Sequence, residues 1–121
     1  MNDTVATTST LKLNAEEYLM REGEESNEMY YLASGTMAVF QRKGDSERQI
    51  ATIYSGELVG EMSFLDSEPR SATVKAIGDC ELTVIPREKL QAYLNSQPKW
   101  YRALVQILID RLRRANKRVR I

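Results

Sequence analysis

The chain has 121 residues, of which 42% are hydrophobic and 28% are charged. This length suits one domain, and the balance of side chains is that of a globular protein. No apolar run approaches the roughly 20 residues that a membrane-spanning helix needs. The chain has no histidine and a single cysteine, Cys80, so a zinc site, a Ser-His-Asp triad and a Cys-His dyad are excluded. We therefore expect no enzyme and no metal site. Because residues 1–10 show no secretory signal, the expected compartment is the cytoplasm.

Positive charge is concentrated at the C-terminal end of the chain. The net charge is zero, yet residues 111–121 hold six basic side chains and no acidic one. The other 11 basic and all 17 acidic side chains belong to residues 1–110. This asymmetry indicates contact between the end and the body, an anionic partner or a solvated helix end.

Short runs of β-branched and aromatic residues fill the first two thirds of the chain. All six glycines lie between residues 23 and 78, where they separate these runs. Such runs, bounded by turn residues at short intervals, indicate an antiparallel sandwich or barrel. The predicted strands are 29–33, 37–41, 50–54, 71–76 and 81–85.

The apolar spacing becomes helical after Pro86. This proline can start a helix over residues 87–95, and Pro98 can start a longer helix over residues 98–119. No internal repeat or linker is visible in the chain, so the two helices are expected to belong to the same domain as the strands.

The longer helix is amphipathic. Its apolar stripe recurs every three or four residues from Trp100 to Val119. We expect the first half of this stripe to pack on the strands, and the part beyond Leu112 to project from the body and meet a partner helix. The opposite, polar face carries Arg102, Gln106, Asp110, Arg113 and Lys117.

Residues 56–73 interrupt the strand pattern and contain groups suited to an anion. Gly60 allows close approach of the backbone, and the residues after it could form a short helical turn. Arg70, nine positions after Glu61, offers a planar fork of donors that matches a phosphate. Ser71 adds a hydroxyl and an amide. From spacing alone, the segment indicates either a pocket for a phosphate and a sugar or a structural ion pair between Glu61 and Arg70.

The same segment resembles the phosphate-binding cassette of the cyclic nucleotide-binding domain family. That family reads Gly-Glu and three small or apolar residues, a short loop, and then Pro-Arg-(Ala/Ser/Thr)-Ala, which residues 60–64 and 69–73 match. Residues 19–39 are similar to the family's first half, and residues 104–119 to its last helices. The resemblance implies a mainly β fold, an antiparallel jelly-roll barrel (double-stranded β-helix), with the C-terminal helices acting as a lid.

The resemblance also implies roles for the cassette residues. Arg70 would bind the exocyclic oxygens of a cyclic phosphate, and Glu61 would take the ribose 2′-hydroxyl. The remaining cassette residues, whose backbone would complete the phosphate cradle, are Gly60, Met62, Ser63, Ser71 and Ala72.

Weaker candidates lie outside the cassette. On the base side of the pocket they are Val39, Ile50, Ala51 and Val59, of which Val59 fits the core better than a ligand contact. In the lid helix they are Arg111, Leu112, Ala115 and Asn116. Asn116 suits either a hydrogen bond to a purine edge or an exposed polar position.

The resemblance implies a regulatory sensor that transmits the presence of a cyclic nucleotide through its C-terminal helix. The recipient would be a protein partner or a second copy, with no cofactor, no DNA-binding domain and no membrane. A hydroxyl after the cassette arginine, here Ser71, can contact a guanine, yet the Arg-Ser-Ala order resembles that of bacterial cAMP-responsive regulators. We therefore favour cAMP over cGMP.

Two other functions remain open for the chain. It could be a relative without ligand binding that acts as a protein interaction module, or it could bind nucleic acid through its basic end. Residues 1–10 are expected to be a flexible N-terminus, and residues 11–121 a single cyclic nucleotide-binding domain that includes both helices.

Overall fold

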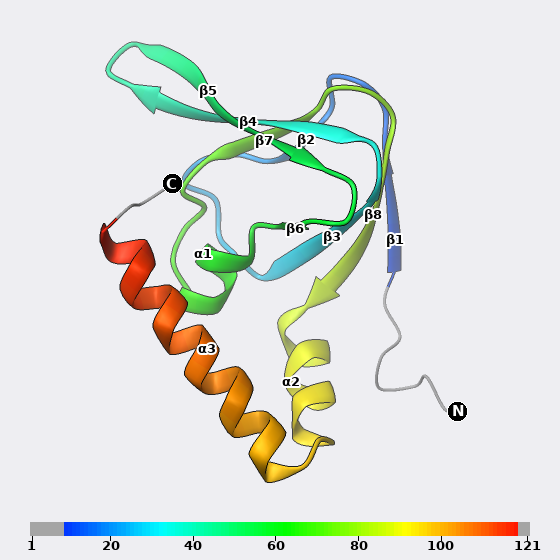
Figure 1. Ribbon diagram of the computed structural model, residues 1–121. Helices are drawn as coiled ribbons and strands as arrows, with labels where there is room; N and C mark the ends of the chain where they lie inside the picture. The colour runs from blue at the N-terminus through cyan, green and yellow to red at the C-terminus, as the bar shows by residue number, and fades with distance from the viewer. Residues whose placement is uncertain (1–8, 119–121) are drawn as a thin grey trace.

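The computed structural model describes residues 9–118, and the side chains as far as Ala115. Its framework is a pair of four-stranded antiparallel sheets that face each other (Figure 1). The strand order is β1-β8-β3-β6 in the first sheet and β2-β7-β4-β5 in the second, which is the order of a jelly roll. The predicted fold class, mainly β with C-terminal helices, is confirmed.

The strands differ widely in length. Those of the first sheet are β1 (Ser9–Leu13), β8 (Cys80–Pro86), β3 (Glu28–Ser34) and β6 (Leu58–Val59). Those of the second sheet are β2 (Tyr18–Met20), β7 (Thr73–Ala76), β4 (Thr36–Lys43) and β5 (Ser46–Tyr54). The five predicted strands correspond to β3, β4, β5, β7 and β8, whereas β1, β2 and β6 were not predicted. The last two have only three and two residues, too few to show a period.

Strand β1 corrects the expectation of a flexible segment over residues 1–10. It begins at Ser9, and its first two residues already pair with β8, Ser9 with Val84 and Thr10 with Thr83. Both side chains are exposed, because β1 forms the edge of its sheet. Residues 1–8 lie outside the described part of the chain.

The core lies between the two sheets. In β3 and β8, apolar residues at every second position point inward, as strand geometry requires, and Leu32 and Leu82 are fully buried there. Met37 of β4 meets them from the second sheet, and Val59 closes one end. This packing positions β4, β6 and β7, three of the strands that border the cavity described below.

Three helices complete the fold. Helix α1 (Glu61–Asp66) follows β6, and α2 (Arg87–Asn95) and α3 (Lys99–Arg118) follow the last strand. Helix α1 is too short to be stable by itself and is fixed by Phe64, whose side chain is buried. In Figure 1, α3 runs from the end of α2 alongside α1.

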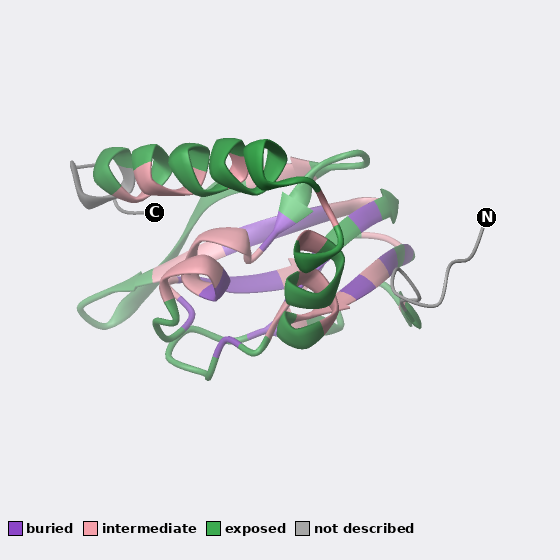
Figure 2. Cartoon of the chain, turned by 90° about the horizontal axis from the view of Figure 1, so that it is seen from below, coloured by how far each residue is buried: buried purple, intermediate pink, exposed green. Residues whose placement is uncertain are grey.

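The apolar stripe of α3 does not pack on the strands, which corrects the expectation for its first half. Trp100 is 68% exposed, and Leu104 and Leu112 are about half exposed. In Figure 2, the outward side of α3 is coloured as exposed and the side toward the body as partly buried. Val105 and Ile109 lie on that partly buried side. The reason is that α3 rests against α1 rather than against a sheet.

Candidate functional site

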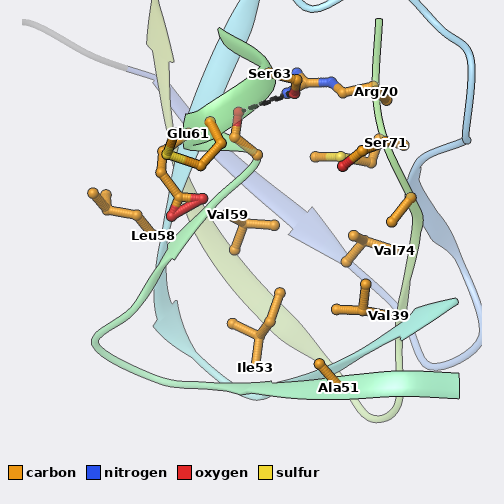
Figure 3. A pocket seen from close by; sticks show the side chains of 14 residues that line it. Val39, Ala51, Ile53, Leu58, Val59, Glu61, Ser63, Arg70, Ser71 and Val74 are labelled. Atoms are coloured by element: carbon orange, nitrogen blue, oxygen red, sulfur yellow. Dashed lines mark hydrogen bonds between the residues drawn. The ribbon is translucent and has the colours of Figure 1, made fainter. Parts of the chain in front are cut away.

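A cavity of about 280 Å³ lies between the second sheet and α1. Its polar end holds Arg70, Ser63 and Ser71, and its other end is aliphatic (Figure 3). The aliphatic side chains that line it are Val39, Ala51, Ile53, Leu58, Val59 and Val74. The remaining lining residues are Met20, Gly60, Glu61, Met62 and Ala72.

Arg70 is fixed at the polar end by backbone carbonyls. It is only 5% exposed. One terminal nitrogen donates to the Gly60 carbonyl at 2.9 Å and to the Ser63 hydroxyl at 3.3 Å, and the other donates to the Glu28 carbonyl at 2.5 Å. The Tyr30 ring lies 5.9 Å from the guanidinium carbon. The guanidinium therefore has one defined orientation.

Gly60 leaves the space that the guanidinium occupies. Its φ of 73° is left-handed, and a Cβ there would lie 2.5 Å from Arg70 Nη1 and 2.8 Å from the Met20 Cε. Only glycine meets both requirements without strain. The requirement for glycine at position 60 therefore follows in part from the space that the Arg70 side chain occupies.

Within the part of the chain that the structure describes, Arg70 forms no direct ion pair, although the charges of Glu28 and Glu24 act on it from a greater distance. The ion pairs found there join other residues, so Glu61 and Arg70 do not form the structural ion pair that their spacing alone allowed. Burial lowers the pKa of Arg70, although a guanidinium still keeps its proton. A buried cation without a directly paired carboxylate favours an anionic ligand.

Glu61 and Tyr30 are also affected by burial. Burial raises the pKa of the Glu61 carboxyl from its ordinary value, and the nearby Glu57 adds to this. Burial also raises the pKa of Tyr30 to about 12, together with the hydrogen bond that its hydroxyl donates to Glu28. Tyr30 therefore stays neutral beside the guanidinium. The cavity thus offers a cation for an anion and a carboxylate that can accept hydrogen bonds from hydroxyl groups.

The structure brings all the cassette candidates to this cavity. Gly60, Glu61, Met62, Ser63, Arg70, Ser71 and Ala72 line it. Of the base-side candidates, Val39, Ala51 and Val59 line it as well. Ile50 does not, because Ala51 and Ile53 point inward and side chains alternate along a strand. Ile50 is 39% exposed instead.

The lid candidates lie elsewhere. Arg111, Leu112 and Ala115 are exposed and do not line the cavity. The side chain of Asn116 lies outside the described part of the structure. Among the α3 side chains that the structure describes, Arg113 reaches the cassette, where it contacts Asp66 and Leu65 of α1, although the sequence pattern places it on the polar face.

Four cavity residues were not predicted: Met20, Ile53, Leu58 and Val74. For Ile53 a signal existed, since it lies two positions after Ala51 and so on the same face of a strand. Val74 could be found in the same way from Ala72. Met20 arrives from β2, a strand without a sequence signal.

Known proteins are similar to this chain in sequence and in fold. Residues 10–97 match the family described as the cyclic nucleotide-binding domain. The chain belongs to the cyclic nucleotide-binding domain family. It is 38% identical over 96 residues to the Cyclic AMP receptor protein of Thermus thermophilus, which corresponds to 78% of this chain and 44% of that protein. The chain spans less than half the length of the curated relatives of this type.

Solved structures that are similar to this chain have the same architecture. The Catabolite Activator Protein of Thermus thermophilus superposes with a TM-score of 0.75 at 31% identity, covering 95% of this chain and 55% of that one. The N-terminal domain of a Streptomyces coelicolor transcriptional regulator gives 0.78 at 29% identity, covering 95% of this chain and 83% of that one. The jelly-roll interpretation is thereby confirmed.

These comparisons establish the general function. The chain is a cyclic nucleotide-binding domain homologous to cAMP receptor proteins, and the matched family is defined by ligand binding rather than by catalysis. Within residues 9–118, no helix combines the length and the apolar character needed to cross a membrane.

Proposed function

We propose that this domain is a regulatory sensor that binds cAMP in the cavity beside α1 and passes the signal on through α3. The observation that carries the proposal is Arg70, a buried guanidinium without a described carboxylate partner, facing the same cavity as Glu61. Such an arrangement suits a ligand that joins an anion to a hydroxyl group. A 3′,5′-cyclic nucleotide has both.

The two ends of the cavity would hold different parts of the nucleotide. Arg70 would bind the exocyclic oxygens of the cyclic phosphate, and the backbone of the cassette would surround them. Glu61 would accept a hydrogen bond from the ribose 2′-hydroxyl. The base would then lie against the aliphatic side chains of Val39, Ala51 and Val59. These make apolar contacts with any purine, which supports the binding of a base without selecting adenine or guanine.

The preference for cAMP rests on Ser71 and on the relatives. Ser71 follows the cassette arginine, where its hydroxyl could favour a guanine. However, two of the curated relatives are named for cAMP in Thermus thermophilus and Mycobacterium tuberculosis. We therefore expect cAMP to bind more tightly than cGMP. Substitution Ser71→Ala should weaken cGMP binding more than cAMP binding.

The exposed stripe of α3 supports the second half of the proposal. It includes Trp100, Leu104, Leu108 and Leu112, each at least 46% exposed. Apolar area of this extent on one helix face favours contact with another protein. We propose a second copy of the chain as the partner, in the cytoplasm, where a free thiol such as Cys80 stays reduced.

Calorimetric titration with cAMP, and separately with cGMP, tests the proposal. Arg70→Lys keeps the charge but loses the planar fork, so we expect its affinity for cAMP to fall by about tenfold or more. Arg48→Lys, on the exposed β5, is the matched control and should bind like the wild type. Circular dichroism of each variant shows whether the fold is kept.

Glu61→Gln provides a second variant, which leaves the hydrogen bonds of Arg70 unchanged. It should weaken binding of cAMP, because a neutral amide accepts a weaker hydrogen bond than a carboxylate. A folded wild-type chain that binds neither nucleotide would contradict the proposal. The alternative of a protein interaction module without a ligand would then stand.

A further inference from the structure

The backbone of Arg70 is held by the loop that precedes β3. The Arg70 amide donates to the Glu24 carbonyl at 2.8 Å, and the Arg70 carbonyl accepts from the Gly23 amide at 2.8 Å. Neither Gly23 nor Glu24 lines the cavity. The peptide unit that joins Arg70 to Ser71 is therefore fixed by residues that a ligand in the cavity would not touch.

The next peptide unit is held by a side chain. The side-chain amide of Gln41 donates to the Ser71 carbonyl at 2.9 Å. Gln41 lies in β4, 30 residues before Ser71, and is partly buried. Ser71 lines the cavity and Gln41 does not. Gln41 can therefore influence a bound ligand only through the cassette.

These two contacts fix the conformation of Ser71. Both peptide units are trans, and a trans unit places its N–H on the opposite side from its carbonyl. The bond between the Arg70 carbonyl and Gly23 therefore directs the Ser71 amide away from Gly23. Because the peptide units on both sides of Ser71 are held, its two backbone dihedral angles are restricted. Figure 3 shows Ser71 next to Arg70 at the polar end of the cavity.

Glutamine at position 41 has no other evident reason within the strand. Side chains alternate along a strand, so Gln41 lies on the same face of β4 as Val39, which lines the cavity. A partly buried strand position favours an apolar or β-branched residue. A polar side chain is tolerated there when its hydrogen bonds are made. The bond to the Ser71 carbonyl supplies such a partner.

We propose that Gln41 is a positioning residue for the phosphate-binding end of the cavity. By holding the Ser71 carbonyl, it keeps the Ser71 amide and hydroxyl beside Arg70, where the exocyclic oxygens of a cyclic phosphate would lie. This inference rests on the proposed function. Loss of the Gln41 amide lowers the population of the arrangement that binds, and the apparent affinity falls in proportion.

The first test is calorimetric titration of the full chain with cAMP. Gln41→Met keeps the length of the side chain but removes the donor, so we expect about fivefold weaker binding, the scale of one neutral hydrogen bond. Gln41→Asn keeps the amide on a shorter side chain and should also bind more weakly. Gln91→Met, at an exposed position of α2, is the matched control and should bind like the wild type. Urea denaturation shows that each variant is folded.

A second measurement separates positioning of Ser71 from a general loosening of β4. In the two diastereomers of adenosine 3′,5′-cyclic phosphorothioate, sulfur replaces one or the other exocyclic oxygen, and sulfur is the weaker acceptor. The diastereomer with sulfur toward Ser71 already lacks the bond that Gln41 supports. Gln41→Met should therefore weaken its binding much less than that of cAMP. For the other diastereomer the loss should equal the loss for cAMP.

The contrary results are distinct from one another. Folded Gln41→Met and Gln41→Asn variants with the affinity of the wild type would overturn the inference. An equal loss for cAMP and both diastereomers would also overturn it, because Gln41 would then only support the strand. Both results leave the proposed function intact, since the wild type binds cAMP. A folded wild type that does not bind cAMP would overturn the proposed function and, with it, the role of Gln41.

Discussion

At the scale of single residues, the cavity depends on how one cation is buried. Arg70 is surrounded by carbonyl groups of Glu28 and Gly60 rather than by a carboxylate. Carbonyl dipoles orient a guanidinium without neutralising it, so its charge stays available to a ligand. Functional sites commonly retain such groups at a cost in stability.

The close packing of Gly60 against Arg70 can be tested by a substitution that adds one methyl group. Gly60→Ala should lower the free energy of unfolding by about 1–3 kcal/mol, because the backbone is left-handed and the added Cβ would meet the guanidinium. Affinity for cAMP should fall with it. Urea denaturation and calorimetry measure the two effects. Gly78→Ala is the control, since nothing lies within 4 Å of a Cβ there. Equal stability losses in both variants would contradict the explanation.

Glu61 should make stability depend on pH in a defined direction. Burial raises the pKa of its carboxyl above the ordinary value of 4.5, so in the window between the two pKa values the folded chain binds more protons than the unfolded chain. Its contribution to stability therefore decreases as pH rises through that window.

The variant Glu61→Gln removes this dependence. It should be more stable than the wild type at pH 7, and the difference should shrink as the pH falls through the window between the two pKa values and disappear below the ordinary carboxyl value. Chemical denaturation at a series of pH values measures this difference. Glu47→Gln, in the exposed β5, should show no comparable change. A stability gain of Glu61→Gln that stays constant with pH would rule out the carboxyl as its source.

At the scale of elements, α1 has an importance beyond its six residues. A helix of this length has no independent stability, and Phe64 anchors it with a buried ring over which Arg87 lies at 4.3 Å. Arg87 in turn donates to the Ser26 carbonyl. The start of α2, the cassette helix and the loop before β3 are thus connected through one aromatic side chain.

Removal of the Phe64 ring should therefore destabilise the whole domain. Phe64→Ala should cost about 3–5 kcal/mol of unfolding free energy, the usual range for a fully buried aromatic side chain. Tyr54→Ala, at a position that is 59% exposed, should change stability by about 0.5 kcal/mol or less. Denaturation by urea compares the two. A loss below about 1 kcal/mol for Phe64→Ala would show that α1 is held by other contacts.

At the scale of the whole molecule, the apolar side chains between the two sheets are buried, whereas many apolar side chains of α3 are exposed. The interior between the sheets is filled by side chains such as Leu32 and Leu82. In contrast, α3 turns its most apolar face outward (Figure 2). A helix with this pattern suits a second helix on its exposed side.

Self-association through α3 is the expected consequence. Sedimentation analysis should show a dimer of the wild type, and the double variant Leu108→Glu, Leu112→Glu should be monomeric because charges would enter the apolar contact. Ile77→Glu, at an exposed apolar position elsewhere, should remain dimeric. A wild type that is monomeric at all accessible concentrations would indicate a partner other than a second copy.

The sequence by itself determined the elements whose signals are local. The five longer strand predictions and the helix after Pro86 follow from period and punctuation. The cassette residues from Gly60 to Ala72 follow from a contiguous motif, and all seven line the cavity. Contiguity is what made them predictable, since neighbours in sequence reach the same place whatever the rest of the chain does.

Only the tertiary structure decided which distant residues meet. Met20, in a strand of three residues, lines the cavity. Ile50 does not line it, because successive side chains of a strand point to opposite faces. The face that α3 turns to the body depends on what it packs against, so periodicity placed Arg113 on the solvent side whereas Asp66 and the Leu65 carbonyl draw it inward. The sequence of an amphipathic helix defines an apolar face and a polar face, but the elements that pack against the helix determine which side is buried.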